Sequence, residues 1–180
     1  MHPYISRFIF AGVGLALGTL GSQALADTVT GNINATLTLI ASCQVNGGTG
    51  ATGQNFGTLN FGTQDALFAS ANAQVMGDGG GAMSILCSSG TIPAIKVGAG
   101  ANDNQSDGGS RALADGNGNY VPYDFYTDAG HTQLLAIDGV ITLPTSTGVA
   151  QTVDLYGQAS GKPGLPAGVY TDTVAVELSF

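Results

Sequence analysis

The sequence predicts an all-β protein, folded as a β-sandwich of one domain. Apolar and polar residues alternate in several stretches of the 180 residues, and such alternation is typical of half-buried strands. Asn-Gly and Asp-Gly pairs, for example Asn46-Gly47 and Asp138-Gly139, separate these stretches and favour tight turns. No stretch after residue 26 combines a helix cap with a long amphipathic repeat, so we expect no long helix there.

Eight strands are expected, at a spacing that suits a sandwich. In chain order they cover residues 29–41, 55–62, 82–87, 92–98, 120–126, 134–143, 150–156 and 169–180. The Gly- and Asp-rich stretch 99–110 is expected to be a loop, and residues 162–168 a second loop before the last strand. The sequence contains neither a fixed-period repeat nor a linker of the kind that separates domains.

Residues 1–26 have the features of a secretory signal peptide. Arg7 supplies the positive charge, the run from Phe8 to Leu20 is apolar, and Ala24-Leu25-Ala26 is a cleavage site. A membrane anchor is the alternative, but the apolar run is short for a bilayer span. We therefore expect export through the periplasm and a mature chain of residues 27–180 without a membrane span.

The charge of the chain excludes one large class of partners. It has 12 acidic residues against 4 basic ones, a formal net charge of −8. After residue 26 the basic residues are Lys96, Arg111 and Lys162, whereas all the acidic residues remain. Nucleic-acid binding requires a basic surface, so we expect no nucleic-acid partner. The 43% of hydrophobic residues also argues against simple disorder.

Cys43 and Cys87 are the two cysteines of the chain. Two cysteines in an exported protein most often form a disulfide, and closing this loop would stabilise the fold by roughly 4 kcal/mol. A metal site with two cysteine ligands is the alternative. It would need His or carboxylate ligands as well, and none is evident near either cysteine in the sequence.

The stretch from Thr28 to Ala41 alternates over about twice the length of a typical strand and contains neither Pro nor a charge. Its apolar face comprises Val29, Gly31, Ile33, Ala35, Leu37 and Leu39. This segment has two interpretations. It is either an ordinary strand of a closed sandwich, or a strand that is donated to the sheet of another subunit.

The end of the chain has a second one-sided strand. Its apolar face comprises Val174, Val176, Leu178 and Phe180. The opposite face includes Glu177, which we expect to face solvent.

The residues of five segments resemble the spore coat protein U domain family and, within it, the pilins of archaic chaperone–usher systems (Csu-type pili). In chain order these segments are VTGNINATLTLIASCQV, NFGTLNFG, ILCSSGT, NYVPYDFYTDAGHTQL and LPAGVYTDTVAVELSF. Their order behind a signal peptide, with two cysteines, is more specific than any one of them. The sequence departs from the pattern at residues 134–136, Leu-Leu-Ala, near a point where many relatives carry Trp.

The resemblance implies an incomplete immunoglobulin-like β-sandwich that lacks its final strand. A periplasmic chaperone would lend a strand, and an outer-membrane usher would exchange it for residues 27–41 of another pilin subunit. The apolar face of the N-terminal segment would be the donor. Val174, Val176, Leu178 and Phe180 would line the floor of the acceptor groove, and the segment after Cys43 would form the other wall. The implied product is a fimbrium on the cell surface that serves adhesion and biofilm formation.

Two other functions remain possible from the residues themselves. Tyr120, Tyr123 and Tyr126 are compatible with a secreted, monomeric carbohydrate-binding module, although tyrosines in strands more commonly belong to a core or its rim. A secreted hydrolase would have to use His131, which lies in a predicted turn without a nucleophile motif and is expected to be exposed. We expect no enzyme activity, no catalytic residue and no cofactor.

A metal site is not expected either. The loop from Asp103 to Gly108 begins like a calcium-binding loop, but the twelfth position is Ala114 instead of the required Glu.

Overall fold

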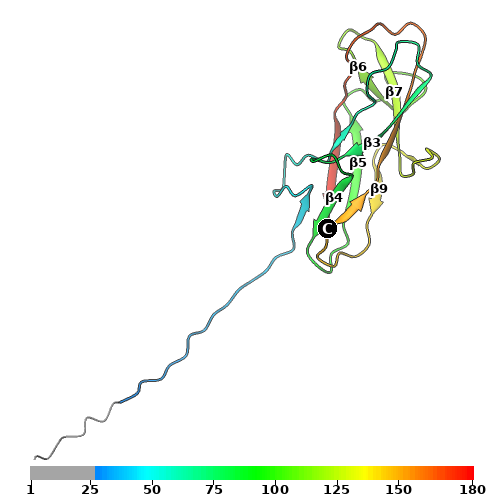
Figure 1. Cartoon of the computed structure of the whole chain (residues 1–180). Coiled ribbons are helices and arrows are strands. Elements are labelled where there is room, and N and C mark those ends of the chain that lie inside the picture. Colours follow the sequence, from blue (N-terminus) through cyan, green and yellow to red (C-terminus); the bar gives the residue numbers. More distant parts are fainter. Residues whose placement is uncertain (1–26) are drawn as a thin grey trace, which may run out of the picture. The chain divides into compact units, whose positions relative to one another are not determined.

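The structure, a computed structural model, describes residues 27–180. The predicted signal peptide, residues 1–26, lies outside the described residues. The chain divides into two units, Met1–Thr38 and Leu39–Phe180. The described residues form twelve strands and no helix, so the predicted all-β class is confirmed (Figure 1). None of residues 27–180 thus belongs to a helix with the length and apolarity of a membrane span.

The strands form three sheets, and every strand pair is antiparallel. The first sheet has the order β1-β4-β10, made of Cys43–Val45, Met83–Cys87 and Gln151–Val153. The second has the order β2-β3-β11-β7-β6, made of Thr58–Leu59, Ser70–Met76, Tyr156–Ser160, Tyr120–Tyr126 and Arg111–Ala114; β8 (Leu134–Leu135) also pairs with β7. The third has the order β12-β5-β9, made of Val174–Ser179, Ala94–Gly100 and Gly139–Thr142.

One hydrophobic core is shared by the three sheets. Alternate residues of β4 point into it, because successive side chains of a strand face opposite sides. Ile85 from the first sheet, Phe125 from the second and Ile95 from the third are all buried in this core. Antiparallel sheets around a common core are the arrangement of an immunoglobulin-like β-sandwich.

Arg111 is an exception to the apolar core, because its side chain is fully buried. The guanidinium donates hydrogen bonds to three backbone carbonyls, those of Leu135 at 3.4 Å, Val97 at 3.2 Å and Gly98 at 2.9 Å. Its Cζ atom also lies 5.0 Å from the centroid of the Phe125 ring. The side chain thus links β6 to β5 and β8 inside the fold.

Three predicted strands agree well with the structure. Residues 120–126 coincide with β7, and residues 82–87 and 92–98 match β4 and β5 to within two residues at each end. The Asn46-Gly47 turn is also present, with positive φ angles of 50° and 80°. The two adjacent positive φ values are the conformation that this dipeptide favours.

The strand predicted over residues 29–41 is wrong, because residues 27–42 form no strand in this chain. The strand predicted over 55–62 shortens to β2. Its flanks turn instead, since the side chains of Asn55 and Asn60 accept hydrogen bonds from the amides of Gly57 and Gly62. Such local bonds compete with strand pairing.

Two other predicted strands are divided in the structure. The stretch 134–143 becomes β8 and β9, separated by a turn in which Asp138 has a left-handed φ of 63°. The stretch 150–156 covers β10 and only the first residue of β11. The last strand, predicted over 169–180, is confined to β12, whereas β3 and β6 were not predicted at all.

Candidate strand-binding groove

The strands β1 and β12 each have one unpaired edge. Within residues 27–180, β12 is hydrogen-bonded only to β5, and β1 forms a ladder only with β4. An unpaired edge presents a row of free backbone N–H and C=O groups that can pair with an added strand. Both edges are therefore candidates for strand addition.

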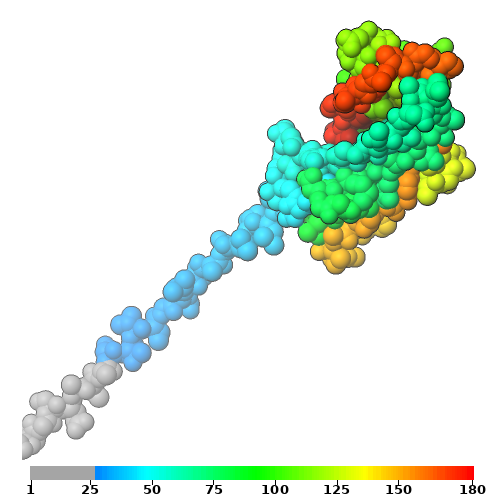
Figure 2. All heavy atoms as spheres, turned by 45° about the horizontal axis from the view of Figure 1, so that its top comes forward, coloured from blue at the N-terminus to red at the C-terminus, as the bar shows by residue number. Residues whose placement is uncertain are grey.

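A groove runs between the C-terminal residues 165–180 and residues 41–66. We use the term groove for three adjoining hollows of about 580, 440 and 690 Å³ along this boundary. The first two share Phe56 and Val176, and the second and third share Leu59, Phe61 and Leu113. In Figure 2 the C-terminal segment, coloured orange to red, lies beside the segment of residues 41–66, coloured cyan to teal.

The two segments that line the groove, residues 41–66 and residues 165–180, run in opposite chain directions. The first hollow is lined by Cys43 and Leu178, the second by residues 54–59 and 172–174, and the third by residues 58–66 and 165–170. Residue numbers thus rise along one wall and fall along the other. A strand that lies antiparallel to β12 would therefore be parallel to the opposite wall.

The floor of the groove is apolar and only partly covered. Val174, Val176 and Leu178 are half-buried and pack on the hydrophobic core, whereas the residues between them are exposed. From the opposite wall, Phe56, Leu59 and Phe61 are also half-buried and pack on the same core. Apolar surface that is left open in a continuous strip is costly in water and marks interaction sites.

Phe180 lines the first hollow and is 54% exposed. All four residues expected in the floor, Val174, Val176, Leu178 and Phe180, thus line the same groove in the structure.

Gly57 holds the opposite wall close to β3. It has a φ of 133°, and a Cβ atom at this position would lie 2.7 Å from both the Met76 carbonyl oxygen and the Val75 Cγ1 atom. A positive φ with so little space favours glycine. The wall residues Phe56, Leu59 and Phe61 were not named from the sequence. Their spacing in NFGTLNFG, in which Leu59 and Phe61 are two residues apart, is the signal that points to them.

Asp172 places a carboxylate in the second hollow. Its Oδ2 atom accepts a hydrogen bond from the Tyr123 hydroxyl at 2.8 Å, and its Oδ1 atom accepts bonds from the Ala101 amide at 3.0 Å and the Asn102 side chain at 3.1 Å. Burial is the main cause that raises the pKa of the Tyr123 hydroxyl far above its usual value, and the hydrogen bond to Asp172 raises it further. The tyrosine therefore remains a neutral hydrogen-bond donor at physiological pH.

Residues 27–41, in contrast, are exposed throughout. Val29 is 96% exposed, Ile33 97% and Leu37 83%. A row of exposed large apolar side chains on one alternating face is unusual for a chain in water, because it leaves that surface without a partner.

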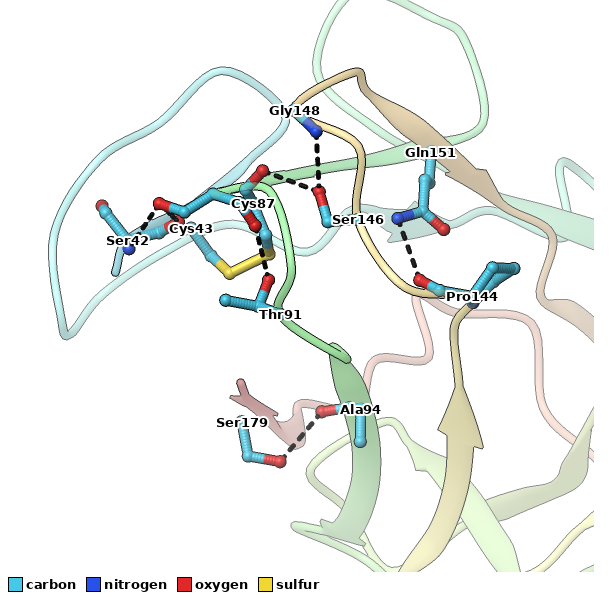
Figure 3. Close-up of a disulfide and its surroundings, with 11 residues drawn as sticks. Ser42, Cys43, Cys87, Thr91, Ala94, Pro144, Ser146, Gly148, Gln151 and Ser179 are labelled. Carbon is cyan, nitrogen blue, oxygen red and sulfur yellow. Dashed lines mark hydrogen bonds between the residues drawn. A yellow bond between two sulfur atoms is a disulfide. The ribbon is translucent and has the colours of Figure 1, made fainter. Parts of the chain in front are cut away.

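The predicted disulfide between Cys43 and Cys87 is confirmed (Figure 3). The two residues are direct partners across the β1–β4 ladder, with their Cα atoms 4.0 Å apart. Ser42 and Ser88 extend the ladder, because the Ser88 amide donates to the Ser42 carbonyl at 2.9 Å. The chain is thus fixed to β4 directly after the exposed residues 27–41.

His131 lies in a turn, as predicted, but it is half-buried and not exposed. Its ring packs edge-on against Tyr126 at 5.2 Å and Tyr156 at 6.3 Å between centroids. In the described part of the chain its side chain has no hydrogen bond to a Ser or to any other nucleophile, so the structure assembles no Ser-His pair there.

The tyrosines considered for carbohydrate stacking do not form one exposed platform. Tyr123 is buried in the core, and Tyr120 and Tyr126 are half-buried. Glu177 is exposed, as expected. Across residues 27–180, no group of three His, Cys, Asp or Glu side chains is placed to hold a metal ion.

The sequence of the chain is similar to those of known proteins. The Spore Coat Protein U domain family matches residues 29–177. Protein U of Myxococcus xanthus is 30% identical over 166 residues, which cover 88% of this chain and 89% of that protein.

One solved structure is a crystal structure of the CsuC-CsuE chaperone-tip adhesion subunit pre-assembly complex from archaic chaperone-usher Csu pili of Acinetobacter baumannii. It aligns with a TM-score of 0.49 and 16% sequence identity, over 79% of this chain and 41% of the matched chain.

Proposed function

Because the chain belongs to the Spore Coat Protein U domain family, we propose that it is a structural subunit of a chaperone–usher surface fibre. In this proposal residues 27–41 of one subunit fill the groove of the next subunit by donor-strand exchange. The observation that carries it is that one chain has two complementary surfaces, each without a partner. The groove has an apolar floor beside the unpaired edge of β12, and residues 27–41 have an exposed apolar face without a partner.

Filling the groove would contribute a favourable free energy at every contact along the fibre. An added strand would pair the free backbone groups of β12 and bury its own alternate side chains. If four of the donor's apolar side chains become buried, at roughly 1.5–3 kcal/mol each, the gross gain is about 6–12 kcal/mol before ordering costs. Each subunit repeats this contact, so the fibre is stabilised along its whole length.

The unpaired edge of β12 favours a donor that lies antiparallel to it, because β12 has six residues against the three of β1 and antiparallel pairing is slightly more stable than parallel pairing. The donor then begins beside Phe180 and leaves the groove beside residues 165–170, whereas each subunit's own segment joins its fold at Cys43, next to Leu178. Each contact therefore joins opposite ends of two subunits. Such a head-to-tail contact does not close on itself and produces a filament.

This function implies a set of transient partners and a route of export. A signal peptide over residues 1–26 would direct the chain to the periplasm. There a chaperone would cover the groove until an outer-membrane usher exchanges the chaperone's strand for that of another pilin subunit. The product would be a fimbrium that supports adhesion and biofilm formation. The chain would have a structural and not an enzymatic role.

A single substitution in the donor tests the proposal. In Leu37→Asp, a carboxylate replaces an apolar side chain that must enter the groove, and burying an unpaired charge is strongly unfavourable. We expect polymer to be lost while export of the monomer continues. Thr36→Asp is the matched control, because Thr36 lies on the opposite, polar face and should keep its polymer. Normal fibre yield from Leu37→Asp would contradict the proposal.

A further inference from the structure

The floor of the groove carries one charged side chain among its apolar ones. Asp172, Val174, Val176 and Leu178 are all half-buried and alternate with exposed residues, so they share the inward face of the C-terminal segment. Asp172 lines the same hollow as Val174 and Val176. An inserted strand therefore meets a carboxylate directly beyond the apolar residues of β12.

The Asp172 carboxylate is held by neutral donors and has no cationic partner. Its three hydrogen bonds come from the Tyr123 hydroxyl, the Ala101 amide and the Asn102 side chain. In residues 27–180 the one ion pair joins Lys96 to Asp138, and the buried Arg111 donates to backbone carbonyls. The negative charge is thus fixed in place without an ion pair. Covering the groove would remove water from this charge and strengthen its effect on any neighbouring charge.

The donor segment matches this charge pattern. Its one charged residue is Asp27, at the start of the segment, and from Val29 to Leu39 its inward face is large and apolar except at Gly31 and Ala35. In the antiparallel orientation, placing Ala35 opposite Asp172 brings Ile33, Gly31 and Val29 opposite Val174, Val176 and Leu178 in turn. This register covers Val174, Val176 and Leu178, brings Asp27 opposite Phe180, and places a small side chain beside the carboxylate.

We propose that Asp172 is a specificity-determining residue of the groove, which rejects donor strands that carry an inward-facing carboxylate at the position of Ala35. The inference rests on the proposed function, since it requires a donor strand in the groove. It goes further by naming the charge that selects among strands of similar hydrophobicity. Selection of this kind needs a repulsive contact as well as attractive ones.

Shape-matched variants of the full chain test this assignment, with polymer measured as the ladder released from cells and run without boiling. Ala35→Asp and Ala35→Asn have nearly the same shape and differ in charge. With Asp172 present, we expect Ala35→Asp to give at least about tenfold less polymer than Ala35→Asn. Adding Asp172→Asn should reduce this deficit to about threefold or less, because the remaining cost is that of burying one carboxylate.

Asp154→Asn is the control for a general change in charge, because Asp154 is exposed and lies outside the groove. It should leave the deficit of Ala35→Asp unchanged. If Ala35→Asp loses the same amount of polymer with and without Asp172, the role assigned to Asp172 is overturned and the proposed function is not. Failure of the unsubstituted chain to form a polymer that depends on residues 28–41 would overturn the proposed function and the assignment together.

A second comparison does not require any change at Asp172, in case Asp172→Asn fails to accumulate. Ala35→Lys would bring a cation beside the carboxylate, and Ala35→Gln is its neutral counterpart. We expect Ala35→Lys to give at least as much polymer as Ala35→Gln. A loss of polymer confined to Ala35→Lys would overturn the assignment, because a fixed anion should favour an inward-facing cation.

Discussion

Cys43, the first residue of β1, is joined by a disulfide to Cys87, the last residue of β4, and the two are direct partners across the sheet. The strand β1 has only three residues, so its ladder alone is a weak attachment. The disulfide fixes it at the residue where the exposed segment 27–41 approaches the fold. It also closes a loop that contains the wall of the groove opposite β12.

Loss of this disulfide should destabilise the fold. In the variant with both Cys43→Ala and Cys87→Ala, we expect the free energy of unfolding to fall by roughly 4 kcal/mol, because the unfolded chain regains the freedom of a long loop. Denaturant unfolding followed by circular dichroism measures this change. The unsubstituted protein in reductant is the control and should match the double variant. A double variant as stable as the oxidised protein would contradict the expectation.

The acceptor floor should contribute to the strength of the fibre through Val176. Val176→Ala removes apolar contact from two adjoining hollows of the groove, at a cost of about 1–2 kcal/mol for each subunit contact. We expect the unboiled ladder to dissociate at a lower temperature in a stepwise heating series. Ala175→Ser, on the exposed face of β12, should leave that temperature unchanged. Equal dissociation temperatures for Val176→Ala and the unsubstituted chain would show that Val176 does not contact the donor.

The sequence predicted best those elements in which local pattern and tertiary pairing agree. In β7 the aromatic and β-branched residues of YVPYDFY favour a strand, and the structure has a strand with the same limits. The alternation of β12 likewise indicated its apolar face. The Asn-Gly turn after β1 was predictable because that dipeptide favours positive φ at both positions.

The sequence failed where pairing overrides local preference. The Ser, Ala, Asn and Gln residues of β3 have weak strand preference, but this strand is paired on both sides, by β2 and β11. The Arg-Ala-Leu-Ala sequence of β6 favours a helix in isolation and becomes a strand by pairing with β7.

The candidate groove was predictable only in part, because some of its residues are positioned by contacts with residues distant in sequence. The alternation of Val174, Val176, Leu178 and Phe180 indicated the floor of the groove. The contribution of Asp172 depends on contacts with Tyr123 and Ala101, which are distant in sequence, so it could not be derived from the pattern of the last strand.

Arg111 should be essential for the packing of β5 against β6. A single basic residue in a strand is expected to be exposed, yet Arg111 is fully buried and bonds to three carbonyls. Arg111→Ala removes those bonds and leaves a cavity, so we expect destabilisation of about 3 kcal/mol.

Arg111→Lys is the informative control, because its ammonium is a compact group that cannot reproduce the planar fork of donors. We expect it to recover only part of the lost stability in denaturant unfolding. Full stability of either variant would contradict the role given to these bonds.

The turn after β7 should loosen in acid because of Asp128. The amide of Gln133 and the amide and hydroxyl of Thr132 donate to this carboxylate, and these bonds hold its pKa below its usual value. A lowered pKa in the folded state means that the stabilisation is present above about pH 4 and is lost as the pH falls through that lowered pKa. The amide signal of Gln133 in an NMR titration should report this change.

Asp128→Asn provides the control for that titration. It keeps one acceptor oxygen and removes the charge, so the acid-dependent shift of the Gln133 amide should disappear. A midpoint for Asp128 at the value of an unstructured peptide, about 3.9, would contradict the expectation.

The most direct test of the central claim is the state of the protein on the cell surface. Sheared material, run on a detergent gel with and without boiling, should give a ladder that collapses to monomer only on boiling. The same experiment on a chain without residues 28–41 should give no ladder, although the monomer is still exported. A single monomer band from the unmodified chain, or a ladder that persists after the deletion, would contradict assembly by donor-strand exchange.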